Sequence, residues 1–216
     1  MTAKTTASPP GDSAQRRYVL LGGRIAVDFA NTVHSVHGPE GALKDWEGLV
    51  AFHGQAGIIS AQRTRELLPM IHADPQAVDA LLRRALALRE ALRQAFGAMA
   101  RHERVERASI EPVNVFLRIT EGHDELVPED HFWMLRFVAR EERPEWLLAA
   151  IARSAAEIIA EGAAAPLRKC ANPGCPLFFY DLSRTGRRRW CSMATCGNRS
   201  KVAAFSKRRG PRRGAC

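Results

Sequence analysis

The sequence predicts a mainly α-helical body with one small β-hairpin, an α+β arrangement, followed by a small C-terminal unit built on four cysteines. Two observations predict this division. Before residue 162, apolar residues recur at steps of three and four, as they do on the buried face of a helix. Four of the five cysteines then fall between positions 170 and 196. At 216 residues the chain can hold one medium domain and a small appended one.

The first part of the body is predicted to contain a short strand and three helices. Residues 18–21 favour a strand, and residues 25–33 favour a helix because apolar side chains recur every four residues. Further helices are expected over 46–57 and 60–72. Ser60 is the expected N-cap of the third helix because its hydroxyl can accept a bond from a free backbone amide.

The longest predicted helix begins at Asp74-Pro75. Aspartate caps free amides, and proline is tolerated at the first helical position. An apolar seam then runs along the helix, formed by Val78, Leu81, Ala85, Leu88, Leu92, Ala95 and Met99. We expect this seam to pack within a helical core; the alternative is a homodimeric coiled coil, for which the seam is short and rich in alanine.

The remainder of the body is predicted to be helix, hairpin and helix. Residues 110–119 favour a helix in which Pro112 lies in the first turn. Two apolar segments within 122–140, separated by Pro128-Glu-Asp130, favour a β-hairpin. A last helix is expected over 145–161. The predicted organisation is a disordered tail (1–16), a body (17–162), a linker (163–167), the cysteine-rich unit (168–209) and a basic tail (210–216).

The cysteines form two pairs, Cys170 with Cys175 and Cys191 with Cys196, and four residues separate the members of each pair. Asn172-Pro-Gly174 between the first two favours a tight turn. A turn and a hairpin can bring four thiolates to one tetrahedral point, which is the coordination that Zn²⁺ adopts at structural sites. The alternatives are two disulfides, ordinary buried cysteines and an iron–sulfur centre. The paired spacing and the absence of an export signal at residues 1–17 favour one structural zinc ion in a cytoplasmic protein.

Two short strands and a helix are predicted around these cysteines. Residues 178–180 and 187–190 favour strands of a hairpin, and residues 195–209 favour a helix whose first turn supplies the last ligand. This order of elements is like that of treble-clef zinc fingers. About forty residues cannot hold a core unaided, so we expect the metal to supply much of the folding free energy.

The net charge of +9 is unevenly distributed. Residues 167–216 hold thirteen basic residues and one acidic residue, so the preceding residues carry a net charge of −3. A basic segment of this kind points to a polyanionic partner, and double-stranded DNA is the partner we expect. The candidate contacts are Arg187, Arg188, Arg189, Asn198, Arg199, Lys201, Lys207, Arg208 and Arg209. Asn198 and Arg199 could read bases or could instead support the metal site.

Two segments of the chain resemble a known bacterial family. The cysteines together with Cys196-Gly-Asn-Arg199 resemble the CGNR-type zinc finger. The segment Leu21-Gly-Gly-Arg-Ile-Ala-Val-Asp-Phe-Ala-Asn-Thr32 resembles the opening of the ABATE domain, which precedes that finger in stress-induced transcription regulators. The resemblance implies that the four cysteines bind zinc, that the finger binds DNA and that the body senses a ligand or stress signal.

Within the body, Asp28, Asn31 and Thr32 share a helix face with apolar residues. They could line a small-molecule pocket, or they could cap and cross-link the backbone. We found no catalytic motif, and four thiolates leave no open position on the metal, so we do not expect an enzyme. Alternative functions are a protein-interaction or RNA-binding finger, or a small-molecule enzyme that the finger targets. No apolar run is long enough to span a membrane.

Overall fold

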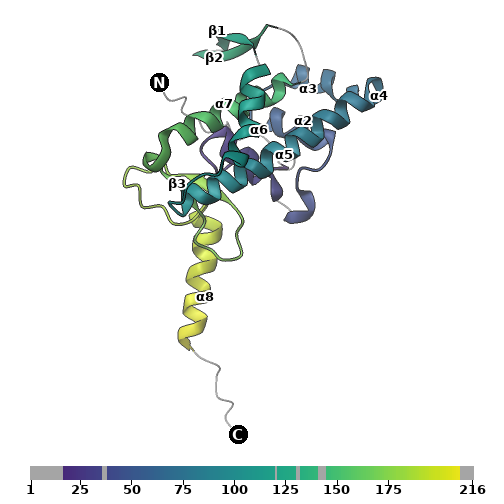
Figure 1. Ribbon diagram of the computed structural model, residues 1–216. Helices are drawn as coiled ribbons and strands as arrows, with labels where there is room; N and C mark the ends of the chain where they lie inside the picture. Colours follow the sequence, from purple (N-terminus) through teal and green to yellow (C-terminus); the bar gives the residue numbers. More distant parts are fainter. Residues whose placement is uncertain (1–16, 36–37, 120, 130–131, 141–144, 210–216) are drawn as a thin grey trace.

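Helices dominate the part of the chain that the computed structural model describes, namely residues 17–35, 38–119, 121–129, 132–140 and 145–209 (Figure 1). The predicted tails, 1–16 and 210–216, lie outside these ranges. The helices and short helical turns are α1 (Ile25–Ala30), η2 (Asn31–Val33), η3 (Pro39–Gly41), α2 (Trp46–Gln55), α3 (Ala61–Leu67), α4 (Met70–Ala73), α5 (Pro75–Ala100), α6 (Arg107–Ile119), α7 (Trp146–Glu161), η4 (Gly162–Ala164), η5 (Met193–Gly197) and α8 (Asn198–Arg209). The strands are β1 (Gly122–Glu129), β2 (Phe132–Ala139), β3 (Leu167–Lys169) and β4 (Phe178–Tyr180). The predicted class, mainly α with a small hairpin and a cysteine-rich finger, is confirmed.

The body is a helical core with α1 and α5 at its centre. α1 packs against α5 and α7, and α6 packs against the same two helices. The predicted seam of α5 is buried from Val78 to Ala95 within this core. The seam therefore packs inside a single chain, as expected for a helical core.

The helix starts follow the predicted capping chemistry. The carboxylate of Asp74 accepts a bond from the Ala77 amide at 3.0 Å, and the Ser60 hydroxyl accepts one from the Arg63 amide at 3.1 Å. The predicted helix over 60–72 is wrong in its extent, because the chain forms α3 and α4 with Pro69 between them. Proline has no amide to continue the hydrogen-bond ladder of α3.

Three other expectations differ from the structure. Residues 18–21 form no strand; Tyr18 makes an isolated bridge to Ser35 instead. α6 begins at Arg107 rather than at residue 110, which places Pro112 inside the helix. Residues 187–190 are not a strand, and β4 pairs antiparallel with β3 instead. The backbone amide of Ala171 donates to the Arg189 carbonyl at 2.9 Å, so this segment bonds to residues 170–175, the first cysteine loop, rather than to β4.

The predicted hairpin of the body is confirmed. β1 and β2 pair antiparallel over eight residues each, from Gly122 opposite Ala139 to Glu129 opposite Phe132. The hairpin lies at the end of the molecule opposite α8 (Figure 1). Arg153 of α7 anchors it through two bonds to the Asp124 carboxylate, at 2.7 and 2.9 Å.

The second small sheet, β3 with β4, joins the finger to the body. β3 contacts α5 and β4 contacts α1. Phe178 and Tyr180 belong to the core of the body, whereas Phe179 between them belongs to a second cluster with the four cysteines. This alternation follows from strand geometry, which sends successive side chains to opposite faces. The strand β4 is therefore shared by two cores.

Helix α8 extends away from the rest of the molecule (Figure 1), and residues 201–206 are all exposed. η5 is a single π-type turn that leads directly into it. Within the described ranges, no helix combines the length and the apolar character needed to cross a membrane.

Candidate metal centre and nucleic-acid interface

The four cysteines converge on one point in the finger. Cys170, Cys175, Cys191 and Cys196 are 2–8 % exposed, and their sulfur atoms all lie within 4.8 Å of one another. The Sγ atom of Cys191 is 3.7 Å from that of Cys175 and 3.7 Å from that of Cys196. Four sulfurs around a tetrahedral Zn²⁺ with bonds of about 2.3 Å would be about 3.8 Å apart. The donor set and its spacing therefore fit one zinc ion.

The first loop is shaped by backbone bonds around Asn172. Its carbonyl accepts the Cys175 amide at 2.9 Å, and its side chain accepts the Gly174 amide at 3.2 Å. This is the turn that asparagine and glycine favour. The Cys170 amide bonds to the Leu177 carbonyl at 2.9 Å, which closes the loop against the start of β4.

The second cysteine loop, residues 191–196, is closed by Ser192 and η5. The Ser192 carbonyl accepts the Gly197 amide at 3.0 Å, and its hydroxyl accepts the Thr195 amide at 3.3 Å. Cys196 lies in this turn, immediately before α8, as predicted. The Trp190 indole donates to the Ser200 hydroxyl at 3.1 Å, and this bond holds the first turn of α8 to the metal loops.

Two of the four thiols, Cys175 and Cys191, resist ionisation in the absence of a cation, whereas hydrogen bonds with Asn172 and the other thiols outweigh burial and lower the pKa of Cys196. Burial and the neighbouring Cys170 thiol together raise the pKa of Cys175 to about 11. Burial and the neighbouring Cys175 and Cys170 thiols also raise the pKa of Cys191. Zinc binding must therefore displace protons, and affinity for the metal falls as the pH is lowered.

Side chains of the body hold the finger at Phe178 and its neighbours. The Asn31 carboxamide accepts the Phe178 amide at 2.8 Å and donates to the Phe178 carbonyl at 2.8 Å. Arg93 of α5 donates to the Pro176 carbonyl at 3.4 Å and lies 5.4 Å from the Phe178 ring. Arg24 lies 4.9 Å from the Tyr180 ring and pairs with Glu161 at 3.1 Å.

The loop before α1 also contacts β4. The Gly22 carbonyl accepts the Tyr180 amide at 2.6 Å. Gly23 has φ +79°, and a side chain at this position would lie 3.1 Å from the Tyr180 carbonyl. Glycine at this position permits both the left-handed backbone and the close approach of the strand.

The three residues predicted to line a ligand pocket bond to the backbone. Asp28 accepts the Gly22 amide at 2.6 Å, Asn31 bonds to Phe178 as described, and the Thr32 hydroxyl donates to the Phe29 carbonyl at 2.7 Å. All three are buried. Burial raises the pKa of Asp28 to about 7, although the backbone hydrogen bonds that its carboxylate accepts oppose the shift. Ligand binding by these residues stays a prediction.

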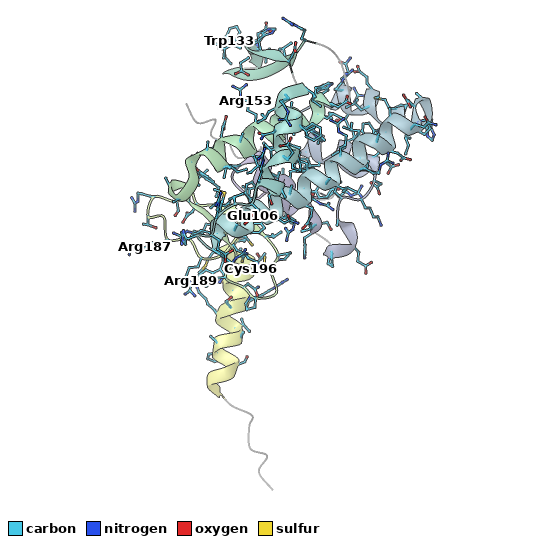
Figure 2. The ribbon with its side chains drawn as sticks, in the orientation of Figure 1. Glu106, Trp133, Arg153, Arg187, Arg189 and Cys196 are labelled. Carbon is cyan, nitrogen blue, oxygen red and sulfur yellow. The ribbon has the colours of Figure 1, made fainter. Side chains whose placement is uncertain are left out.

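The described basic side chains that follow β4 fall into two groups. Arg188 is used inside the finger, where it donates to the Trp190 carbonyl at 2.9 Å and to the Cys191 carbonyl and lies 4.5 Å from the Phe179 ring. In the other group the side chains are exposed, and within residues 145–209 they make no ion pair with a carboxylate: Arg184, Arg187, Arg189, Arg199 and Lys201. Figure 2 shows Arg187 and Arg189 at the surface near Cys196, at the base of α8. The backbone of α8 continues through Lys207, Arg208 and Arg209.

The three residues after Cys196, predicted either to read bases or to support the metal site, lie in different environments. Gly197 is buried, and a side chain there would lie 2.5 Å from Met193 Sδ. Asn198 donates to the Ala194 carbonyl at 3.0 Å. Arg199 is exposed, and within the described ranges it makes no hydrogen bond or ion pair. It borders a shallow groove lined by Ala194, Thr195, Asn198, Arg199, Val202 and Ala203.

Two family models match this chain. Residues 23–162 match the ABATE family, described as "putative stress-induced transcription regulator". Residues 167–209 match the CGNR zinc finger. The chain belongs to the ABATE family. The body is thus an ABATE domain, and the four clustered cysteines after it are the zinc site of a CGNR finger. Among curated proteins, no match was found.

Sequence reasoning identified the zinc ligands of the CGNR finger but missed how the ABATE domain holds it. The sequence leaves Asn31 as either a pocket residue or a backbone cross-link without naming its partner, and it does not single out Arg93. A signal did exist at the strand, because Phe178, Phe179 and Tyr180 are consecutive large aromatic residues. A short continuous apolar strand is typical of one that is buried on both faces.

Proposed function

We propose that this ABATE family member is a DNA-binding transcription regulator, not an enzyme. In this proposal the CGNR finger docks on duplex DNA by electrostatic attraction, the zinc ion holds the fold of the finger, and the ABATE domain senses a small ligand or stress signal. The observation that carries the proposal is the group of exposed cations near the base of a helix that extends from the molecule, namely Arg187, Arg189, Arg199 and Lys201. Arg184, on the loop that precedes Arg187, is exposed as well. The family description supports the regulatory role.

The chemistry of the metal site supports a structural zinc. Four buried thiolates fill the tetrahedron, so no position stays open for water or substrate. The zinc would fix the turn η5, from which α8 begins, and would thereby orient the basic residues on the helix. Phosphate contacts would supply affinity, and Arg199, which lines the groove at the base of α8, would be the candidate for reaching a base edge.

The test is binding of the zinc-loaded protein to duplex DNA over a range of salt concentrations. If six to eight basic residues contact phosphates, the log–log slope of affinity against salt should be roughly −5 to −7. Removal of zinc should abolish binding, because α8 would lose its anchor. Arg187→Gln should reduce both the affinity and the slope. Arg153→Gln, at the opposite end of the molecule (Figure 2), is the charge-matched control and should change neither.

Other results would redirect the proposal. If the zinc-loaded protein ignores duplex DNA at low salt, DNA binding is wrong and an acidic protein becomes the partner to seek. Tighter binding to single-stranded RNA than to duplex DNA would make RNA the ligand, although Phe178, Phe179 and Tyr180 are buried and could not stack on its bases without a change of structure. Turnover of a small molecule in the absence of DNA would contradict a non-enzymatic body.

A further inference from the structure

We propose that Asn31 and Arg93 are positioning residues of the zinc site, which hold the first pair of ligands in place before the metal binds. Neither residue touches the metal ligands themselves. Both act from the ABATE domain on the short segment 176–180, which follows Cys175 directly. This proposal does not depend on DNA binding.

The Asn31 side chain pairs with the backbone of β4 in the way that a neighbouring strand would. Its carboxamide satisfies both backbone groups of Phe178, each at 2.8 Å, on the edge of β4 that β3 does not occupy. The side chain is 2 % exposed. Two buried bonds to one peptide position fix both the place and the orientation of the strand, because loss of either would leave a buried polar group without a partner.

Arg93 bonds to Pro176, the residue directly after the metal ligand Cys175. Its guanidinium bridges the Ala30 carbonyl at 3.1 Å and the Pro176 carbonyl at 3.4 Å, and it covers the Phe178 ring. The peptide that carries the Pro176 carbonyl continues to Leu177, whose own carbonyl accepts the Cys170 amide. Arg93 therefore connects α1 and α5 to the chain directly after Cys175 and, through Leu177, to the Cys170 end of the first cysteine loop.

This arrangement changes the expected role of the metal. If the body holds β3, β4 and the first loop without zinc, the metal need order only the second loop and the start of α8. Pre-organised ligands bind more tightly because less conformational entropy is lost on binding. Outer residues that orient metal ligands typically contribute about 10–100-fold in affinity.

The chain offers a matched control for each substitution. Arg93→Met removes a partly buried guanidinium that reaches the finger. Arg89→Met, one turn earlier on α5, removes one that reaches the Leu43 and Thr32 carbonyls of the body. Asn31→Leu removes the carboxamide that reaches Phe178, and Thr32→Val removes a hydroxyl whose bond to Phe29 stays within the body.

The experiment is competition for zinc between the full-length protein and a chelator of known affinity, with thermal unfolding of each variant measured alongside. Arg93→Met and Asn31→Leu should each weaken zinc binding by about 10–100-fold. Arg89→Met and Thr32→Val should leave the zinc affinity within about threefold, even where they lower the melting temperature as much. Equal zinc affinities in the test and control variants would overturn the proposal.

A second measurement needs no variant and covers the case in which Asn31→Leu or Arg93→Met fails to fold. In the zinc-free full-length protein, the amides of Phe178 and Tyr180 should stay protected from hydrogen exchange, because their acceptors, Asn31 and Gly22, belong to the body. The amides of Ala171 and Gly197, whose acceptors Arg189 and Ser192 lie just before and within the second loop, should exchange fast. Equally fast exchange at all four amides would overturn the proposal.

Discussion

At the scale of single residues, two arginines of the finger carry the same charge in different environments. Arg188 is partly buried, and its guanidinium serves two carbonyls and an aromatic ring. Arg199 is exposed beside the groove at the base of α8. The sequence alone does not separate them, because each is an arginine three residues from a metal ligand in a basic segment. Their partners arise from folding, so the two predicted nucleic-acid contacts must be tested separately.

Arg199→Ala should weaken DNA binding without changing zinc content or melting temperature, since within the described ranges its side chain makes no hydrogen bond or ion pair. Loss of one phosphate contact should reduce the salt slope by about 1, and loss of a base contact should cost about 1–3 kcal/mol for the preferred sequence. Arg188→Ala should behave differently and lower the melting temperature of the zinc-loaded protein. Similar melting behaviour in both variants would contradict this assignment.

Asp28 should make the stability of the fold depend on pH. Its pKa is about 7 in the folded protein and near 3.8 when unperturbed. Between these values the folded state binds more protons than the unfolded state, so stability falls as the pH rises from about 4 to about 7. From pH 5.5 to pH 8 the loss from this group should be about 2 kcal/mol.

Urea unfolding of the zinc-loaded protein at these two pH values measures the effect. Asp28→Asn cannot ionise and keeps an oxygen for the Gly22 amide, so the variant should lose most of this pH dependence. Asp74→Asn, at the exposed cap of α5, should retain the pH dependence of the wild type. An unchanged dependence in Asp28→Asn would mean that another group titrates.

At the scale of elements, β4 is the strand on which both cores depend. Phe178 is 3 % exposed in the core of the body, where its ring lies 6.4 Å from that of Phe96. Phe179 is fully buried with the cysteines. Substitutions at Phe178 and Phe179 should therefore affect the stability of different parts of the molecule.

Phe178→Ala should cost about 3–5 kcal/mol in the free energy of unfolding whether or not zinc is present, because it leaves a cavity in the core of the body. Phe179→Ala should cost a comparable amount in the zinc-loaded protein and much less in the zinc-free protein, where the second loop is not held. Urea unfolding of both variants in both states measures the difference. Equal costs in the zinc-free state would contradict the division of β4 between two cores.

The elements that sequence predicted best are those with local causes. Asp74 and Ser60 begin helices because their side chains cap neighbouring amides, and the α5 seam follows from its spacing. The predicted strand at 187–190 is wrong, because β4 pairs with β3 instead. The zinc ligands were predictable because metal coordination restricts their types and spacing. The role of Asn31 was not predictable, because its partner Phe178 lies 147 positions away in the sequence.

At the scale of the whole molecule, body and finger have contrasting charge and a common interior. Residues before 167 carry a net charge of −3, and the remainder holds thirteen basic residues against one acidic residue. Yet Leu167, Phe178 and Tyr180 of the finger are buried in the same cluster as α1, α5 and α7. A common interior makes the two parts unfold cooperatively, as single cores do.

Heating the zinc-loaded protein should therefore release zinc and melt the helices in one transition. Far-ultraviolet circular dichroism follows the helices, and a chromogenic chelator in the same sample follows the metal. The two curves should coincide within error, since loss of the body removes the bonds that hold the first cysteine loop. Zinc release well below the loss of helical signal would show that the finger opens by itself.

Because β4 contributes side chains to both cores, deletion of the finger should also affect the body. The ABATE match ends at residue 162 and the finger match begins at residue 167, which suggests two parts that could be inherited separately. A deletion at that boundary would strip Leu167, Phe178 and Tyr180 from the interior of the body and leave the ring of Phe96 and the carboxamide of Asn31 uncovered. Exposed surface of this kind promotes self-association. A mutation that deletes the finger should therefore produce an aggregating fragment rather than a free-standing sensor, and physical constraint alone would tend to keep the two segments together in descendant genes.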